Sequence, residues 1–178
     1  MTEGTVARRY AQALFDLAGK HDLVEPINRD WQLFIKSLQE NDRLFDILIS
    51  KVISKDHQKV LLKSIFEHDI HPLMLDFLCL LIDKDRMAIV SDISFYYQQL
   101  IWQKNNIIPV QLTTAYPLPS EQNQQLLQAV SELLNKNVLF DITVNDSLIG
   151  GAVLKIGDTT YDGSVKNQLR TIKQLLVN

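Results

Sequence analysis

The sequence predicts a mainly α-helical protein, with an N-terminal six-helix bundle followed by a small α/β domain. Residues 5–105 contain few glycines and repeat apolar residues with a helical period. After Asn105-Asn106, short runs alternate between apolar and polar residues, which is typical of strands. Three of the six glycines lie between Gly150 and Gly157, and this concentration indicates a bent strand and a tight turn. We therefore predict two domains, residues 1–105 and residues 106–178.

Composition and charge restrict the class of protein. A chain of 178 residues, of which 46% are hydrophobic and 22% charged, is long and apolar enough to fold around a core. The net charge of −3 argues against a nucleic-acid binder, which usually carries a basic stripe. The single cysteine, Cys79, excludes an internal disulfide and fits residence in the cytosol. We expect no secretory signal and no direct membrane insertion, because no apolar run reaches roughly 18 residues.

The first helix is predicted to begin with Thr5 as its N-cap and to end near Gly19-Lys20. Its apolar residues form two stripes that together cover roughly 200° of the helix surface. One stripe contains Val6, Tyr10, Ala13 and Leu17, and the other contains Ala7, Ala11, Leu14, Phe15 and Ala18. A helix on a single core needs an apolar face of only a little over ~100°. The helix is therefore either enclosed by its own domain or equipped with a second face for a partner.

The other helices of the first half follow from local signals. The chain is predicted to be helical from Asp22 to about Gln39, over a short piece from Leu44 to Ile49, and from Ser54 through Phe66. His71-Pro72 begins the fifth helix, since proline is tolerated in a first turn. Residues 73–82 are apolar except for Asp76, so this helix also has more apolar surface than one packing face needs. The residues predicted to point inward are Trp31, Phe34, Ile35 and Leu38, and, from a last helix over 86–104, Ile89, Ile93, Tyr97, Leu100 and Ile101.

The second half is predicted to be a small α/β unit. A strand covers residues 107–115, and Pro109 near its start implies an edge strand or the beginning of a strand. Ser120 is predicted to cap a helix, and further strands cover residues 138–144 and 152–156, with a short return over 159–161. Ser164 is predicted to cap the last helix. The residues expected to point inward from the two helices are Leu126, Leu127, Val130, Leu133 and Leu134, and Val165, Leu169, Ile172 and Leu176.

No catalytic or ligand-binding motif emerges from the chain. The glycines lack the lysine and the spacing of a phosphate-binding loop, so we expect no nucleotide cofactor and no small-molecule substrate. Turn and capping chemistry accounts for Asp158 and Asp162 without a metal. Capping or solvation accounts equally for the four histidines. A small enzyme that uses Asp158, Asp162 and His71 remains an alternative, and binding of magnesium, zinc or ATP would reveal it.

Four segments, in the same order along the chain, resemble the delta subunit of bacterial F-type ATP synthase, the counterpart of the mitochondrial oligomycin-sensitivity-conferring protein. They are V-A-R-R-Y-A-Q-A-L-F-D-L-A from Val6, L-D-F-L-C-L-L-I-D-K-D-R from Leu75, T-T-A-Y-P-L-P-S from Thr113 and D-S-L-I-G-G from Asp146, the last continued by I-G-D and Y-D-G-S-V. The resemblance covers essentially the whole chain.

The resemblance implies a non-catalytic stator subunit that links the catalytic head to the b-subunit stalk and resists rotor torque. It would lie at the cytoplasmic face of the bacterial inner membrane. The first domain would bind the N-terminal helix of an alpha subunit in a groove between the first and fifth helices. Matching positions for this site are Tyr10, Ala13, Leu14, Leu17, Asp76, Phe77 and Leu80. The second domain would contact the C-terminal end of the stalk, with Ser147, Gly150 and Gly151 as a first assignment. An unrelated helical protein–protein adaptor is the alternative.

Overall fold

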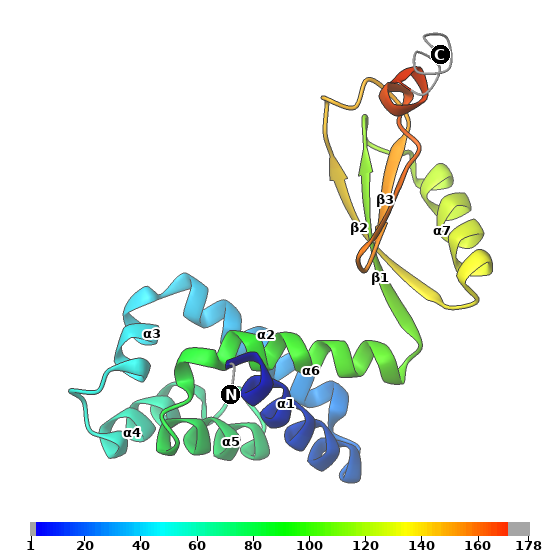
Figure 1. The fold of residues 1–178 in the computed structure, drawn as a ribbon. Helices are drawn as coiled ribbons and strands as arrows, with labels where there is room; N and C mark the ends of the chain where they lie inside the picture. Colours follow the sequence, from blue (N-terminus) through cyan, green and yellow to red (C-terminus); the bar gives the residue numbers. More distant parts are fainter. Residues whose placement is uncertain (1–2, 171–178) are drawn as a thin grey trace. The chain divides into compact units, whose positions relative to one another are not determined.

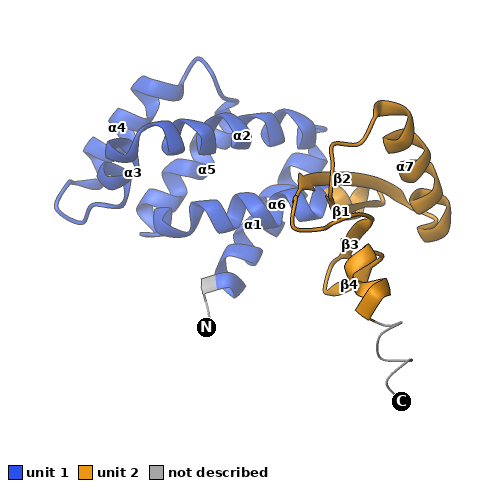
Figure 2. Cartoon of the chain, turned by 90° about the horizontal axis from the view of Figure 1, so that it is seen from above, with its two compact units in different colours: residues 1–101 blue, residues 102–178 orange. Residues whose placement is uncertain are grey.

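The fold is mainly helical, with a small mixed four-stranded sheet toward the C-terminus. In the computed structural model, residues 3–170 are described (Figure 1). The chain forms two compact units, residues 1–101 and 102–178, which Figure 2 shows in blue and orange. We describe each unit by itself.

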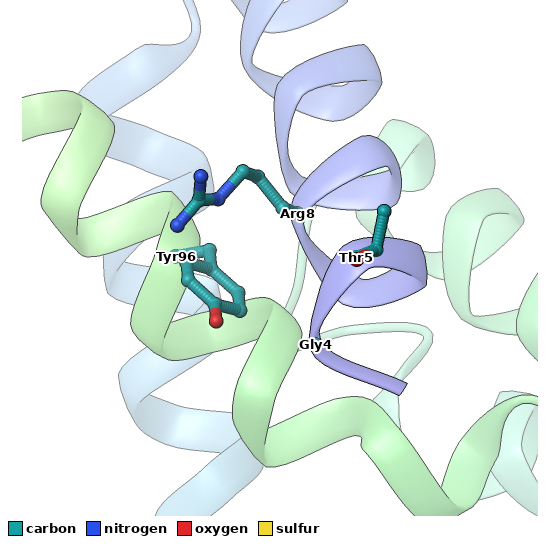
Figure 3. Close-up of a pocket in the computed structure, with 4 residues that line it drawn as sticks. All are labelled: Gly4, Thr5, Arg8 and Tyr96. Atoms are coloured by element: carbon teal, nitrogen blue, oxygen red, sulfur yellow. The ribbon is translucent and has the colours of Figure 1, made fainter. Parts of the chain in front are cut away.

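The helices of the first unit are α1 (Glu3–Lys20), α2 (Val24–Glu40), α3 (Asp42–Ile49), α4 (Lys55–Phe66) and α5 (Pro72–Asp83), followed by the 3-10 helix η1 (Met87–Ile89) and by α6 (Val90–Lys104). The helix positions are close to those predicted, but the chain predicted as one last helix over 86–104 is divided into η1 and α6. The prediction that Thr5 caps the first helix is wrong, because α1 already begins at Glu3. Near its N-terminal end α1 contacts α6, with the Arg8 guanidinium 5.1 Å from the centroid of the Tyr96 ring (Figure 3).

Side-chain caps explain where two of these helices begin. The Ser54 hydroxyl accepts a hydrogen bond from the His57 N–H and starts α4. His71 does the same for α5 through Nδ1, which accepts the Leu73 N–H at 3.1 Å, and Pro72 occupies the first helical position. Both starts match the predictions. The turn between α1 and α2 uses Asp22 in a left-handed conformation with a φ of 55°, although Gly19 lies nearby.

The core of the first unit contains the residues that the helical period places inward. Its largest fully buried side chains come from five helices, so the core is continuous through the unit. These side chains include Trp31, Phe34, Leu62, Phe66, Met74, Leu78, Leu81, Ile93 and Tyr97. Two predicted inward residues, Ile35 and Leu100, are only partly buried at its margin, as is Phe15 of the α1 stripe.

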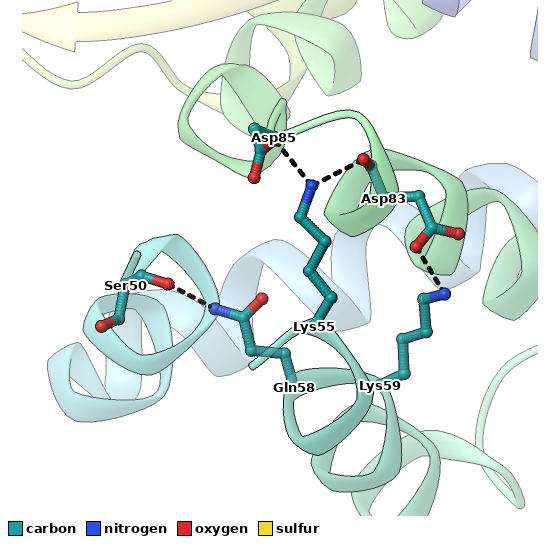
Figure 4. Close-up of polar contacts among 6 residues, drawn as sticks. All are labelled: Ser50, Lys55, Gln58, Lys59, Asp83 and Asp85. Atoms are coloured by element: carbon teal, nitrogen blue, oxygen red, sulfur yellow. Dashed lines mark hydrogen bonds and ion pairs between the residues drawn. The ribbon is translucent and has the colours of Figure 1, made fainter. Parts of the chain in front are cut away.

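Gln58 joins the end of α3 to α4 from within the core. Its side-chain Nε2 donates hydrogen bonds to the carbonyl oxygens of Ile47 and Ser50, each at 2.8 Å, and Figure 4 shows the contact with Ser50. Gln58→Leu keeps the volume but leaves the Ser50 carbonyl without this donor. We expect the free energy of unfolding to fall by about 2 kcal/mol, measured by urea titration. Gln39→Leu, at an exposed position of α2, is the control and should change it by less than about 0.5 kcal/mol; equal effects would contradict this account.

Tyr97 makes the stability of the first unit sensitive to alkaline pH. The side chain is fully buried, and its hydroxyl donates to the Val24 carbonyl oxygen at 3.2 Å. Burial raises the pKa of Tyr97, and the nearby charges of Glu25 and Asp30 raise this pKa further. The unfolded chain ionises a tyrosine near pH ~10, whereas the folded chain keeps this proton. The stabilising contribution is therefore complete below pH ~10 and is lost as the pH rises above it.

Comparison with Tyr97→Phe isolates this effect. At neutral pH the variant should be about 1 kcal/mol less stable because it lacks the hydrogen bond. Above pH ~10 only the wild-type chain loses stability through Tyr97, because the variant has no ionisable group at this position. The difference in the free energy of unfolding between the two chains should therefore shrink by about 1.4 kcal/mol per pH unit. Urea unfolding at several alkaline pH values measures both chains. If the stability difference between the two chains stayed constant with pH, Tyr97 would not be the source of the alkaline sensitivity.

The second unit is built on a four-stranded sheet with the order β2-β1-β3-β4. Its elements are β1 (Ile107–Thr114), α7 (Ser120–Leu134), β2 (Asn137–Val144), β3 (Ala152–Ile156) and β4 (Thr159–Asp162). Strands β1 and β2 are parallel and joined through α7, whereas β1–β3 and β3–β4 are antiparallel pairs. Helix α7 lies beside the sheet (Figure 1), and its Val130 is buried. The helix after β4 begins at Val165, and the Ser164 hydroxyl caps it by accepting the Asn167 N–H at 3.2 Å, as predicted.

Several details of the second unit differ from the predictions. Strand β1 is an interior strand, yet Pro109 pairs only with Leu139 of β2, because pairing with β3 begins at Val110. Proline has no backbone N–H to donate, and this is tolerated at Pro109 because β3 does not pair with this residue. Helix α7 starts one residue early, with Pro119 in place of Ser120 as N-cap. Leu127, Leu133, Val165 and Leu169 are exposed, because no described element covers these sides of their helices; Ile172 and Leu176 lie outside the described residues.

Candidate functional site

The two apolar stripes of α1 have different environments. Ala7, Ala11, Leu14 and Ala18 are buried in the core of the first unit. On the other stripe, Tyr10 is half-buried, Ala13 is exposed and Leu17 has 40% of its surface exposed. Spacings of three and four residues place these three on one face of the helix. The first unit therefore does not enclose α1 completely, and the surplus apolar stripe lies at the surface.

Helix α5 also exposes part of its apolar surface. Asp76 is exposed, and Leu80, one turn later, is 42% exposed. Two lysines of α4 hold the C-terminal end of the helix (Figure 4). Lys59 Nζ lies 2.5 Å from the Asp83 carboxylate, while Lys55 Nζ lies 2.8 Å from the Asp83 carbonyl oxygen and 2.6 Å from the Asp85 carboxylate. The Asp83 carboxylate raises the pKa of Lys59 by accepting its hydrogen bond.

Helices α1 and α5, to which the resemblance assigns the head-binding site, contact each other. The rings of Tyr10 and Phe77 meet edge to face, with their centroids 6.3 Å apart. Leu14 and Phe77 themselves are only 2% and 9% exposed, so they lie beneath the surface and belong to the core. We call the accessible set the α1/α5 surface, defined as Tyr10, Ala13, Leu17, Asp76 and Leu80.

Of the residues predicted for the stalk contact, Gly151 lies beside a cavity. The cavity has a volume of about 520 Å³ and is lined mainly by the segment after β1 and by α7. Its lining residues are Thr114, Ala115, Tyr116, Pro117, Leu118, Pro119, Gln122, Leu126, Gly151 and Ala152. Ser147 and Gly150 do not line it. Sequence reasoning missed Tyr116, Leu118 and Leu126, although the aromatic and proline-rich loop after β1 was a signal for an apolar surface.

A smaller cavity of about 230 Å³ lies on α1 away from the α1/α5 surface. It is lined by Gly4, Thr5, Arg8 and Tyr96 (Figure 3). Arg8 and Ala13 are five positions apart, which places their side chains on opposite sides of α1. The cavity is therefore separate from the α1/α5 surface.

Two of the three residues of the alternative enzyme, Asp162 and His71, have structural roles. Asp162 accepts the Ser164 N–H at 2.9 Å, and its hydrogen bonds with Ser164 lower the pKa of this carboxyl group. His71 caps α5 in the first unit, whereas Asp158 and Asp162 belong to the second. Over residues 3–170, no three histidine, cysteine or acidic side chains gather in a way that would hold a metal ion. Burial raises the pKa of the Cys79 thiol, which makes it a weaker nucleophile at neutral pH.

None of the helices within residues 3–170 is both long enough and apolar enough to cross a bilayer.

Comparison with known proteins agrees with the motifs in the sequence. The family model described as ATP synthase delta (OSCP) subunit matches residues 6–176. ATP synthase subunit delta of Syntrophus aciditrophicus is 32% identical over 177 residues, which cover 99% of this chain and 98% of the relative. The subunit of the same name from Desulfitobacterium hafniense is 34% identical over 176 residues, with 99% and 98% covered.

A solved structure shares the fold over the full length. A chain of the Toxoplasma gondii mitochondrial ATP synthase hexamer, solved by cryo-EM, superposes with a TM-score of 0.71 at 20% identity. The match covers 100% of this chain and 98% of that chain. The family match rules out both alternatives, the unrelated adaptor and the small enzyme. The chain belongs to the ATP synthase delta (OSCP) subunit family and is thus a non-catalytic subunit of the peripheral stalk of an F-type ATP synthase, which binds the catalytic head and the stalk.

Proposed function

We propose that the α1/α5 surface binds the N-terminal helix of an alpha subunit and so attaches this subunit to the catalytic head. The observation that carries the proposal is the exposed apolar stripe on α1, which meets α5 at the Tyr10–Phe77 contact. An amphipathic helix recognises such a surface by laying its apolar face along it, with contacts spaced three and four residues apart. Small Ala13 would let the partner backbone approach closely, while Leu17 and Leu80 would supply apolar contacts on either side.

The free energy of this attachment would come mainly from apolar burial. Burial contributes about 25 cal/mol for each Å² removed from water, less the cost of ordering the partner helix. Leu17 and Leu80 are each about two-fifths exposed in the free chain, so both have apolar surface left to bury. Leu14 and Phe77 would support the surface from below without touching the partner.

We place the stalk contact in the second unit, at the cavity beside Gly151. The lining is mainly apolar and includes an exposed aromatic ring, Tyr116, and exposed aromatic residues are common anchors in interfaces. The occupant would be the C-terminal end of the b-subunit stalk. Ser147 and Gly150, which do not line the cavity, would then lie outside the main contact.

The mechanism is mechanical. Residues 1–105 would hold the catalytic head and residues 106–178 the stalk, so that rotor torque drives catalysis and does not turn the head. The complex would place this subunit at the cytoplasmic face of a bacterial inner membrane. No cofactor takes part in this role.

Calorimetric titration of the full chain with a peptide of the alpha-subunit N-terminal helix tests the head contact. We expect saturable binding at a one-to-one ratio, and no binding of a peptide with the same composition in scrambled order. Absence of binding by a well-folded chain would overturn the assignment of the α1/α5 surface.

A further inference from the structure

A set of three aromatic rings extends from the α1/α5 surface into the first unit. The Tyr10 ring of α1 contacts the Phe77 ring of α5 with centroids 6.3 Å apart and an angle of 71° between the planes. The Phe77 ring in turn contacts Trp31 of α2, at 6.0 Å and 78°. We call these three residues the aromatic bridge. It joins three helices that lie within the same unit (Figure 2).

Only one end of the aromatic bridge reaches the surface. Tyr10 is half-buried, whereas Phe77 is 9% exposed and Trp31 is 1% exposed. Tyr10 precedes Ala13 by three positions on α1, and Phe77 precedes Leu80 by three on α5. The ring contact therefore lies between the two exposed faces, at the level where a partner helix would be held. Phe77 of α5 contacts the Tyr10 ring of α1 and the Trp31 ring of α2, so its size affects how far α5 lies from α1.

We propose that Phe77 and Trp31 are positioning residues for head binding, which set the separation of α1 and α5 without touching the partner. This inference rests on the proposed function of the α1/α5 surface. Protein interiors are close-packed, so removal of a ring shifts the neighbouring helices or leaves a void. A partner helix that contacts both α1 and α5 is sensitive to a change of their separation even when the fold survives.

The indole of Trp31 supports this role. Its Nε1 is buried and has no hydrogen-bond partner among the described residues. A buried donor without an acceptor is destabilising, and phenylalanine at this position would avoid the cost. The bulk and shape of the indole, which fills the space beside Phe77, explain why this residue fits here.

The test separates affinity from stability. Phe77→Leu and Phe66→Leu remove the same atoms from the core of one unit; Phe66 is 2% exposed and pairs with Phe34 at 5.2 Å. We expect both variants to lower the midpoint of thermal unfolding. Only Phe77→Leu should weaken binding of the alpha-subunit peptide, by about tenfold, because the partner helix would then meet α1 and α5 at a changed separation. Affinity is measured by calorimetry at a temperature where both variants are folded.

Each result decides the inference. Unchanged affinity of folded Phe77→Leu, or an equal loss in Phe66→Leu, would overturn it. If Phe77→Leu does not fold, Phe77→Met, which keeps most of the volume and lacks the ring, is titrated with the same expectations. Failure of the wild-type chain to bind the peptide would instead contradict the proposed function. A wild-type chain that binds normally while Phe77→Met also binds normally would contradict the aromatic bridge alone.

Discussion

Replacement of Ala13 by aspartate is expected to weaken binding of the alpha-subunit N-terminal helix by about 100-fold or more. Ala13 is exposed on α1 between Tyr10 and Leu17, where a partner helix would cover it. The new carboxylate would lose its water without gaining a positive partner, and an unpaired buried charge costs about 3 kcal/mol or more. The fold should survive, because the free chain leaves this position open to solvent. Calorimetric titration with the alpha-subunit peptide measures the loss.

Ala129→Asp is the matched control for this prediction. Ala129 is an exposed alanine of α7 in the second unit, so the substitution has the same helix-propensity cost of about 0.5 kcal/mol. It should leave the affinity unchanged. Full affinity in a folded Ala13→Asp chain would show that the alpha-subunit helix binds elsewhere, and an equal loss in both variants would point to a general effect of negative charge.

Gly151→Ala is expected to destabilise the second unit by about 3 kcal/mol or more. Gly151 has a φ of 81°, a backbone angle that residues with a side chain rarely adopt. A Cβ atom there would collide with the carbonyl oxygen of Gly163 and lie 3.0 Å from the Ser164 Cα. The backbone cannot move aside easily, because the Gly163 N–H bonds to the Ala152 carbonyl oxygen and the Val165 N–H to the Gly150 carbonyl oxygen, both at 3.0 Å.

Gly157→Ala separates backbone strain from collision. Gly157 also has a positive φ, 57°, but a Cβ atom there would meet nothing within 4 Å. Only the conformational cost remains, about 1–2 kcal/mol. Hydrogen exchange of the β3 amides reports the free energy of opening in the second unit of both variants. If Gly151→Ala proved no more destabilising than Gly157→Ala, the close approach of the two segments would play no part in stability.

Local chemistry made much of the fold predictable. Ser54, His71-Pro72 and Ser164 begin helices because their side chains or ring satisfy the first turn. These signals act over three or four residues and do not depend on the rest of the chain. The two wrong caps, Thr5 and Ser120, both lie inside helices that begin before the predicted positions. Helix α1 begins at Glu3, and α7 begins at Ser120 with Pro119 as its N-cap.

Strand order was beyond the reach of the sequence. Pro109 correctly marked the beginning of a strand, but its position left open whether β1 is an edge strand. The interior position of β1 results from pairing with both β2 and β3, and both lie far from β1 along the chain. Such pairing depends on the register of distant segments and leaves no local signal. The cavity beside Gly151 depends on the same pairing, so its other lining residues were not predicted.

The sequence by itself determined the family, through four motifs in order, and the apolar faces of α1 and α5, through their helical period. The tertiary structure alone decided which of these apolar residues remain accessible. Leu14 and Leu17 are the same residue type on one helix, and Phe77 and Leu80 are both apolar residues of α5, so the pattern treats each pair alike. Leu14 and Phe77 are buried while Leu17 and Leu80 are exposed, because exposure depends on which neighbouring helix packs over each position. That packing is a property of the whole unit and not of the local sequence.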